Sequence, residues 1–286
     1  ARIVSAHGRD CNLIALIRHN PKVFSILGTE DGVARLASRL VAYGMGDVTL
    51  YVGENLSYEN EKIFHASAAE LTEYRGDALS VVTACNEKAV PLPAVHGICD
   101  EEFLRGKAPM TKEEVRTVSL SKLRLQEDSV CYDVGAGTGS VSVEMALRAW
   151  KGQVYAIEKK EDALALLKEN RRKFATDNLE IVPGTAPEAM VELPVPTHAF
   201  IGGSSGNMNE IIRLLLDKNP GVRIVINCIT LETVTEAMNA IRDFSLTDVD
   251  IVQLSAARSK SIGRYHMMMG ENPIYIISCS GRGEEI

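Results

Sequence analysis

The sequence lacks several features that would by themselves assign it to a class. It has no run of about 18 apolar residues, so nothing in it predicts a membrane span or a membrane partner. It also lacks the charged and apolar blocks of a signal peptide. Aromatic residues make up only 5% of the 286 residues, but 45% are hydrophobic, which is enough for a sizeable core. We therefore expect a cytoplasmic, globular protein with one large domain or two modest ones.

Basic residues are in the minority. The 31 lysines and arginines are outnumbered by 38 aspartates and glutamates, and the formal net charge is −7. A general nucleic-acid binder would present a basic face, so we expect no nucleic-acid partner. The six cysteines are scattered without a Cys-x-x-Cys pair, which predicts reduced, buried thiols and no bound metal. The sequence has no initiator methionine and begins in a strand-like run at residues 2–4, from which we expect a fragment of a longer protein.

Hydrophobic periodicity divides the chain into two segments joined by a linker. In residues 1–90, short apolar runs predict strands, and apolar positions three and four apart predict a helix at residues 31–43. The periodicity stops at residues 91–103, where prolines and a glycine predict the linker. The strands of this first segment are expected at residues 22–27, 48–52 and 79–84.

Strands and helices alternate regularly in residues 104–286. Such alternation predicts an α/β domain with a parallel sheet covered by helices on both faces. The last two strands have no helix between them, which predicts an antiparallel pair at the edge of the sheet. The strands are expected at residues 130–134, 154–157, 179–182, 198–201, 223–227, 248–254 and 273–278. The helices are expected at residues 112–125, from 140, and at 162–174, 208–216 and 232–244.

The strongest motif is a glycine-rich loop between the first strand and the first helix of this repeat. Glycines recur at every second position after an acid, whereas a dinucleotide fingerprint would need its third glycine at Ser140. Glycine lets the backbone approach a ligand closely, and such ligands bind at the carboxyl ends of the strands. The spacing is typical of S-adenosylmethionine enzymes. We expect cofactor contacts from Asp133, Gly135, Ala136, Gly137, Thr138 and Gly139.

Two further signals lie at the ends of the next strands. Glu158 ends the second strand, 19 residues beyond Gly139, where a carboxylate can accept hydrogen bonds from both ribose hydroxyls. The alternative is a solvated surface acid. After the third strand, Gly184, Thr185 and Ala186 form a small-residue turn that can lie beside an adenine ring, although Pro183-Gly184 is also an ordinary turn.

With these motifs, the chain resembles the decarboxylating precorrin methyltransferases of cobalamin biosynthesis, which act at C5 and C15 of the corrin precursor. The resemblance implies a seven-stranded, Rossmann-like class I methyltransferase domain that uses S-adenosylmethionine. It implies C15 methylation of precorrin-6B or cobalt-precorrin-6B, with decarboxylation of the C12 acetate, by a homo-oligomer that is commonly a tetramer. It also implies that Thr111 lies by the cofactor and that Gly202, Gly203 and Ser204 meet the substrate. The stretches that carry the resemblance are residues 108–116, 133–139, 200–204 and 272–277.

The first segment resembles the C-terminal half of the C5-methylating domain, of the tetrapyrrole methylase type, so the chain would hold a partial domain of this kind. The signatures are at residues 4–9, 27–29 and 52–56. The glycine-rich N-terminal half of that domain is missing, which implies half an active site. His7 and Arg9 are expected to meet a substrate carboxylate or to pack against the missing half.

A substrate with many carboxylates requires a local basic pocket in an acidic protein. We expect it in two loops, one before the first strand and one between the last two. His266 in the second loop is a candidate proton donor, or else caps the loop, and His198 departs from the family's usual acid as a tolerated variation. The candidate cations are Arg105, Lys107, Lys112, Arg258, Lys260 and Arg264.

Two other functions stay open. The same cofactor fold serves RNA and protein methyltransferases. The absence of an Asn/Asp-Pro-Pro-Tyr motif after the fourth strand and the acidic charge argue against a nucleic-acid amine. The chain could also be an assembly or regulatory fragment that binds the cofactor without turning over.

Overall fold

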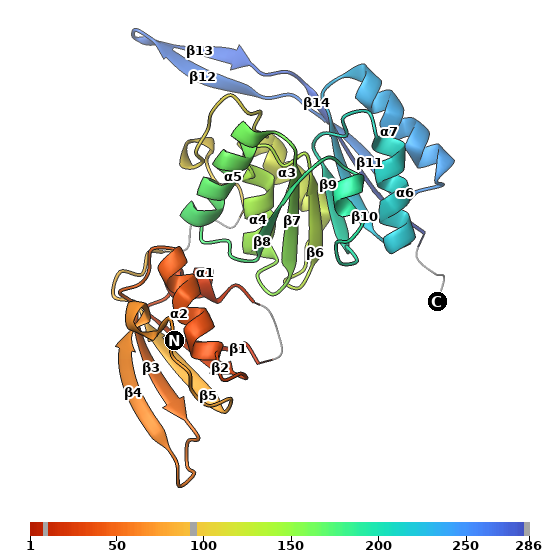
Figure 1. Ribbon diagram of the computed structural model, residues 1–286. Helices are drawn as coiled ribbons and strands as arrows, with labels where there is room; N and C mark the ends of the chain where they lie inside the picture. The colour runs from red at the N-terminus through yellow and green to blue at the C-terminus, as the bar shows by residue number, and fades with distance from the viewer. Residues whose placement is uncertain (8–10, 92–95, 283–286) are drawn as a thin grey trace. The chain divides into compact units, whose positions relative to one another are not determined.

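The computed structural model describes residues 1–7, 11–91 and 96–282, which form two compact units (Figure 1). The first unit comprises Ala1–Pro93 and Arg171–Asn178, and the second comprises Ala94–Asn170 and Leu179–Ile286. None of the helices in the described ranges has the length and apolar character needed to cross a bilayer.

The first unit is a five-stranded mixed sheet with helices packed against one face. Its strand order is β1-β2-β5-β3-β4, in which β1 and β2 are parallel and the other neighbours antiparallel. Side chains alternate along β2, where Val23 and Leu27 join the core while Lys22 and Ile26 are exposed. The strands are β1 (Arg2–Ser5), β2 (Lys22–Leu27), β3 (Thr49–Glu54), β4 (Lys62–Ser67) and β5 (Ser80–Cys85). The helices are α1 (Leu13–His19) and α2 (Gly32–Ala42), with a short 3-10 helix at Ala68–Leu71.

The second unit is built on a seven-stranded sheet in the order β11-β14-β10-β9-β6-β7-β8. The strands from β6 to β10 are parallel, and β14 is antiparallel to both β10 and β11, so the expected antiparallel pair lies at this edge. The strands are β6 (Val130–Val134), β7 (Gln153–Glu158), β8 (Leu179–Pro183), β9 (His198–Ile201), β10 (Arg223–Cys228), β11 (Thr247–Leu254) and β14 (Ile274–Ser280).

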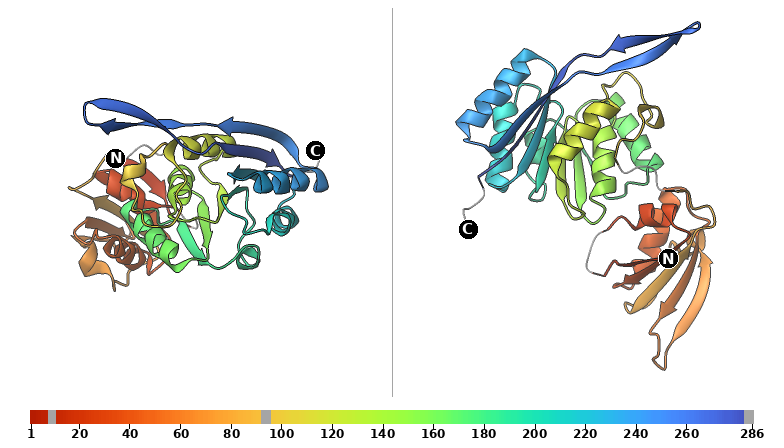
Figure 2. Two further views of the ribbon diagram at one scale, coloured as in Figure 1. Left: turned by 90° about the horizontal axis from the view of Figure 1, so that it is seen from above. Right: turned by 180° about the vertical axis from the view of Figure 1, so that it is seen from behind.

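Helices cover both faces of this sheet (Figures 1 and 2). Strand alternation assigns the two layers: Ile226 and Cys228 of β10 pack in the core with α6 and α7, whereas Asn227 faces α3. A seven-stranded sheet of this architecture agrees with the class I methyltransferase fold expected from the sequence. The helices are α3 (Glu113–Leu123), α4 (Ser140–Arg148), α5 (Glu161–Lys173), α6 (Met208–Lys218) and α7 (Leu231–Asp243).

A β-hairpin projects from the sheet between β11 and β14. Its strands, β12 (Ala257–Ile262) and β13 (Tyr265–Gly270), pair only with each other among the described residues. The sequence predicted a loop here, and that prediction was wrong. We name the hairpin, Ala257–Gly270, the arm; Figures 1 and 2 show it extending away from the sheet.

The expected linker at residues 91–103 is only partly described, because residues 92–95 lie outside the described ranges. Its later part packs into the second unit. Ile98, Asp100 and Phe103 are each at most 3% exposed, and a 3-10 helix spans Asp100–Glu102.

Candidate active site

A cavity of about 680 Å³ opens at the carboxyl ends of the parallel strands of the second unit. Its volume lies within the range of about 300–1,000 Å³ that is typical of small-molecule sites. The cavity brings together most of the residues that the sequence predicted for cofactor and substrate. Those in its lining are Thr111, Lys112, Gly135, Ala136, Gly137, Glu158, Gly184, Thr185, Ala186, Gly202, Gly203 and Ser204.

The glycine loop is held between two neighbouring backbone segments. Gly135, Gly137 and Gly139 have φ of +77°, +56° and +79°, a region that favours glycine. A Cβ on Gly135 would lie 2.9 Å from the Gly203 carbonyl oxygen, and one on Gly137 would lie 2.7 Å from that of Pro109. The glycines therefore also permit close backbone packing, in addition to the ligand approach that the sequence predicted.

Glu158 is a buried, anchored carboxylate of the cavity wall. It is 8% exposed, which does not agree with the alternative of a solvated surface acid. The backbone N–H of Gly137 donates to its Oε2 at 2.8 Å, and those of Lys159 and Lys160 donate to its Oε1 at 2.8 and 2.9 Å. A carboxylate offers about four acceptor positions, so Glu158 retains capacity for a ligand hydroxyl.

Asp133 faces away from the cavity, toward α4. Its side chain is fully buried, the Ser142 hydroxyl donates to Oδ2, and Oδ1 has no hydrogen-bond partner among the described residues. Burial raises the pKa of Asp133 to about 7, and the charge of Glu158 adds to the effect. Asp133, Thr138 and Gly139 belong to the predicted cofactor motif but are not part of the cavity lining.

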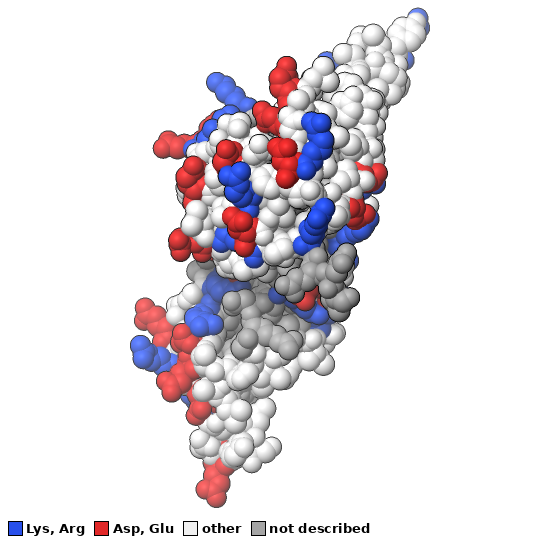
Figure 3. Space-filling model, turned by 90° about the vertical axis from the view of Figure 1, so that its right-hand side faces the viewer, with Lys and Arg blue, Asp and Glu red and all other residues white. Residues whose placement is uncertain are grey.

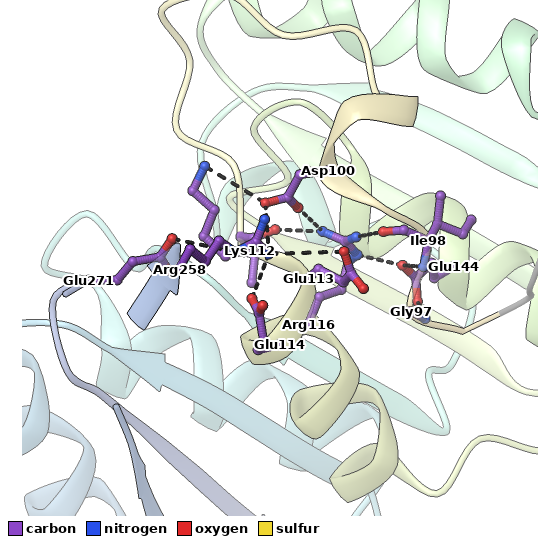
Figure 4. Close-up of polar contacts among 11 residues, drawn as sticks. Gly97, Ile98, Asp100, Lys112, Glu113, Glu114, Arg116, Glu144, Arg258 and Glu271 are labelled. Atoms are coloured by element: carbon purple, nitrogen blue, oxygen red, sulfur yellow. Dashed lines mark hydrogen bonds and ion pairs between the residues drawn. The ribbon is translucent and has the colours of Figure 1, made fainter. Parts of the chain in front are cut away.

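A buried ion network fixes the wall that carries Thr111 (Figure 4). The Arg116 guanidinium, fully buried on α3, pairs with Glu144 of α4 and with Asp100 at 3.3 Å, and donates to the Thr111 carbonyl oxygen at 2.6 Å. Glu144 in turn accepts from the N–H groups of Gly97 and Ile98 at 2.9 and 3.1 Å. Through these contacts the network joins residues 97–111 to both helices.

The expected basic loop is the arm, and its charged residues are placed differently from the prediction. Arg258, at the base of the arm, pairs with Glu114 at 2.6 Å, Asp100 at 3.4 Å and Glu271 at 3.8 Å (Figure 4). Its guanidinium lowers the pKa of the Glu114 carboxyl. Arg264 lies in the turn of the arm and His266 on β13, both exposed. Arg105, Lys107, Arg258, Lys260, Arg264 and His266 are not in the cavity lining, whereas Lys112 is.

Residues 102–280 match a family model described as the precorrin methyltransferase domain. The chain belongs to this family. A probable cobalt-precorrin-6B C(15)-methyltransferase (decarboxylating) of Pyrobaculum calidifontis is 44% identical over 188 residues, covering 65% of this chain and 96% of that protein. The cobalt-precorrin-6B C(15)-methyltransferase (decarboxylating) of Salmonella typhimurium is 42% identical over 182 residues, 63% of this chain and 94% of that protein.

A solved structure agrees with this family. The precorrin-6y C5,15-methyltransferase of Geobacter metallireducens superimposes with a TM-score of 0.62 at 39% identity, covering 66% of this chain and 98% of that chain. The seven-stranded sheet of the second unit therefore belongs to a precorrin methyltransferase domain.

Sequence reasoning missed several residues of the precorrin methyltransferase cavity. Asn227 ends β10, and the rule that ligands lie at carboxyl ends of parallel strands could have identified it. Glu271 follows β13 directly, in a stretch for which the sequence predicted only a loop. The missed lining residues are Pro109, Met110, Val115, Val134, Ile157, Lys159, Lys160, Ala163, Ser205, Asn227, Ile229, Gly270, Glu271, Asn272 and Ile274.

Two histidines that the sequence analysis named are not part of the cavity lining. His7 is exposed in the first unit with its ring against Gly28, and Arg9 lies outside the described residues. His198 begins β9, at the opposite end of the strand from the cavity, with Nδ1 2.8 Å from the Thr197 hydroxyl. Burial lowers the pKa of His198 to about 4, so the ring is neutral.

Proposed function

We propose that the chain methylates a precorrin-6B-type tetrapyrrole, in its cobalt form, at C15 and removes the C12 acetate as carbon dioxide. The observation that carries this proposal is the cavity, which gathers the glycine loop, Glu158 and the Gly202–Ser204 turn in one site. The relatives that share this domain are named for C15 methylation with decarboxylation of cobalt-precorrin-6B. The reaction belongs to cobalamin biosynthesis.

The residues present fit S-adenosylmethionine. Glu158 has acceptor capacity left for the ribose, the small residues Gly184 to Ala186 leave room for a flat base, and the loop at Gly135 to Gly137 exposes backbone to the cavity. The cofactor supplies a methyl group that is activated by its sulfonium. Because methyl transfer depends chiefly on alignment, the contribution of the chain is to position both ligands and to exclude water.

The lysines of the lining are better placed than the arm for substrate carboxylates. Lys159 and Lys160 line the cavity, and Lys159 Nζ lies 3.0 Å from the Ser205 hydroxyl. Lys112 also lines the cavity, but its Nζ lies 3.8 Å from Asp100 Oδ2. Arg258 is paired with carboxylates, so we infer that it braces the arm rather than holding substrate. No described residue is assigned as the proton donor. His266 and Arg264 lie on the arm, outside the cavity lining, so they would donate a proton only in the cavity of a second copy of the chain.

The decisive test is product analysis with cobalt-precorrin-6B and methyl-labelled S-adenosylmethionine. Label at C15 together with released carbon dioxide is the expected result. Label in RNA or protein, with an unchanged tetrapyrrole, would favour the other methyltransferase classes. Cofactor binding without any turnover would favour a non-catalytic fragment.

We also propose self-association through the arm. Cross-strand pairing puts Ile262, Tyr265, Met267 and Met269 on one face, each at least 49% exposed. Lys260 and Arg258, opposite Met267 and Met269, lie on the same face. Exposed apolar side chains gathered in this way mark a protein interface. Figure 3 shows the arm as mostly uncharged, whereas acidic and basic side chains are interspersed over the rest of the visible second unit. This supports a homo-oligomer, and a tetramer is the state that the family resemblance implies.

For the first unit, we propose the C-terminal half of a C5-type tetrapyrrole methylase domain. The support is the sequence signature at residues 27–29 and 52–56, which lie at the ends of β2 and β3. The family match begins at residue 102 and does not extend over residues 1–93.

A further inference from the structure

Asn227 has an unsatisfied polar group inside the cavity. Its side chain, at the end of β10, is 8% exposed and belongs to the lining. Its Nδ2 has no hydrogen-bond partner among the described residues. Buried polar groups in proteins are almost always paired, so an unpaired donor in a ligand cavity points to a partner on the ligand.

The neighbouring helix orients this amide. The Ser119 hydroxyl of α3, fully buried, lies 3.0 Å from Asn227 Oδ1 and 2.8 Å from the Val115 carbonyl oxygen. The hydroxyl has a single proton, and where it donates this proton to Oδ1 the amide oxygen lies against α3 and the amide N–H groups face the cavity. Ile229 and Ile274, which also line this part of the cavity, provide no acceptor in their side chains.

The position of β10 in the sheet decides which ligand Asn227 meets. Strand β6, with the glycine loop, lies between β7 and β9, and the residues that fit the adenosine follow β7 and β8. Asn227 is on the other side of β6, beyond β9 and beside β14. This end of the cavity is therefore separated from the ribose and the base and lies on the side that is left for the second ligand.

We propose that Asn227 is a substrate-binding residue whose side-chain amide donates a hydrogen bond to a carboxylate oxygen on the tetrapyrrole. Ser119 acts as its positioning residue. This inference rests on the proposed function, because it takes the acid side chains of the tetrapyrrole as the acceptor. A neutral amide binds such an oxygen without placing a buried cation against the apolar wall of Ile229 and Ile274.

The test measures tetrapyrrole binding directly from its visible absorption, with cofactor affinity measured in parallel by calorimetry. N227A should weaken tetrapyrrole binding about 10- to 100-fold, as expected for a lost hydrogen bond to a charged group. N227D should weaken it further, because two carboxylates would face each other. S119A should give a smaller loss, and cofactor affinity should change less than twofold in all three variants.

N239D is the matched control. It introduces the same charge on α7, where Asn239 contacts Arg242 and is not part of the cavity lining, and it should bind tetrapyrrole as the parent does. Thermal unfolding identifies any variant that fails to fold. If N227D or S119A does not fold, the result for N227A alone decides the test.

Three outcomes would overturn the inference. Parent-like tetrapyrrole binding by N227A would make Asn227 purely structural. A loss of cofactor affinity in place of tetrapyrrole affinity would assign it to the cofactor. Parent-like binding by N227D beside a weakened N227A would mean that the amide oxygen, and not its nitrogen, faces the ligand. If the parent protein neither binds nor converts any tetrapyrrole, the proposed function itself fails, and this inference fails with it.

Discussion

Glu158 links the glycine loop to the cavity through a single carboxylate. It accepts the Gly137 N–H with one oxygen and the first two N–H groups after β7 with the other. Its removal would therefore loosen the loop as well as take away a ligand acceptor. This double role explains why an acid at the end of the second strand accompanies a glycine loop at the end of the first.

Glu158→Ala should lower S-adenosylmethionine affinity at least tenfold. Each hydrogen bond to a charged group contributes about 1.5–3 kcal/mol, and the variant loses the ribose contact and an anchor of the loop. Isothermal titration calorimetry gives the affinity. Glu161→Ala, an exposed glutamate in the first turn of α5, is the control and should bind as the parent does. A change below twofold at Glu158 would place the ribose elsewhere.

Asp133 should make stability depend on pH. Its folded pKa, about 7, is above the value of 3.8 for a free side chain, so the folded state holds a proton that the unfolded state releases between about pH 4 and 7. The contribution of Asp133 to the free energy of unfolding therefore falls as pH rises through this window, by up to about 1.4 kcal/mol per pH unit. The contribution of His198, whose pKa is lowered to about 4, rises over the part of the window below about pH 6.5. Asp133→Asn should remove the contribution of Asp133 and gain stability relative to the parent at pH 8.

Urea unfolding of the ligand-free protein at pH 5 and pH 8 measures this effect. Asp217→Asn, the same change at an exposed position on α6, is the control and should leave the slope unchanged. An Asp133→Asn variant with the parent's pH dependence would mean that the buried carboxyl is not protonated in this range.

Single residues were predictable from the sequence where their role depends on spacing along the chain. Glu158 follows from its distance to the glycine loop and from the end of its strand. Asp133 was assigned to the ligand, although its neighbour two residues earlier, Cys131, is fully buried and strand alternation puts both toward α4. Asn227 has no motif around it, because its environment is created by α3, which is more than 100 residues away.

At the scale of elements, the arm is the feature that the sequence concealed. Strands in the sheet are recognisable because one or both of their faces are buried, whereas every residue of β13 is exposed. The sequence from Tyr265 to Gly270 therefore shows no alternation between buried and exposed positions. The β-strands of the second unit that face helices were predicted to within a few residues, since burial imposes their pattern.

Met267→Lys with Met269→Lys should reduce self-association. The two changes replace apolar side chains by charged ones on the face that carries Ile262 and Tyr265, beside Lys260, which costs binding free energy wherever that face is covered. Light scattering should show a smaller assembly, while calorimetry shows unchanged cofactor affinity. Ser261→Lys, on the opposite face of the same strand pair, is the control. An assembly of unchanged size would exclude this face of the arm as the interface.

The ion network of α3 and α4 should be essential to the second unit. Arg116→Ala would leave Glu144 and Asp100 buried without their main partner, and breaking a buried pair in this way costs about 3–5 kcal/mol. Arg124→Ala removes an exposed pair with Asp248 and should cost at most about 1 kcal/mol. Urea unfolding compares the two variants, and equal effects would show that the network contributes little.

At the scale of the whole molecule, the cavity is built from one of the two units. All residues of the cavity lining belong to the second unit. The first unit has its own core of apolar side chains from α1, α2 and its sheet. Periodicity predicted two segments, but it assigned residues 171–178, which cluster with the first unit, to the second segment. It also placed residues 97–103 in a linker, because contacts with Glu144 and Arg116 leave no local pattern.

The chain should methylate C15. The glycine loop and the cavity of the second unit supply one cofactor site for this step. Product analysis with carbon-13-labelled S-adenosylmethionine should find one label per macrocycle, at C15. A doubly labelled product would mean that the first unit completes a C5 site of its own.

The strand order also sets when the second unit can finish folding. β14 lies between β10 and β11, and it is made after every other strand of the sheet. Until it emerges from the ribosome, β11 has no neighbour to pair with and the outer edge of β10 stays open. The sheet can therefore close only after β14 has been synthesised. Until then, the open edge of β10 must be kept from pairing with another chain.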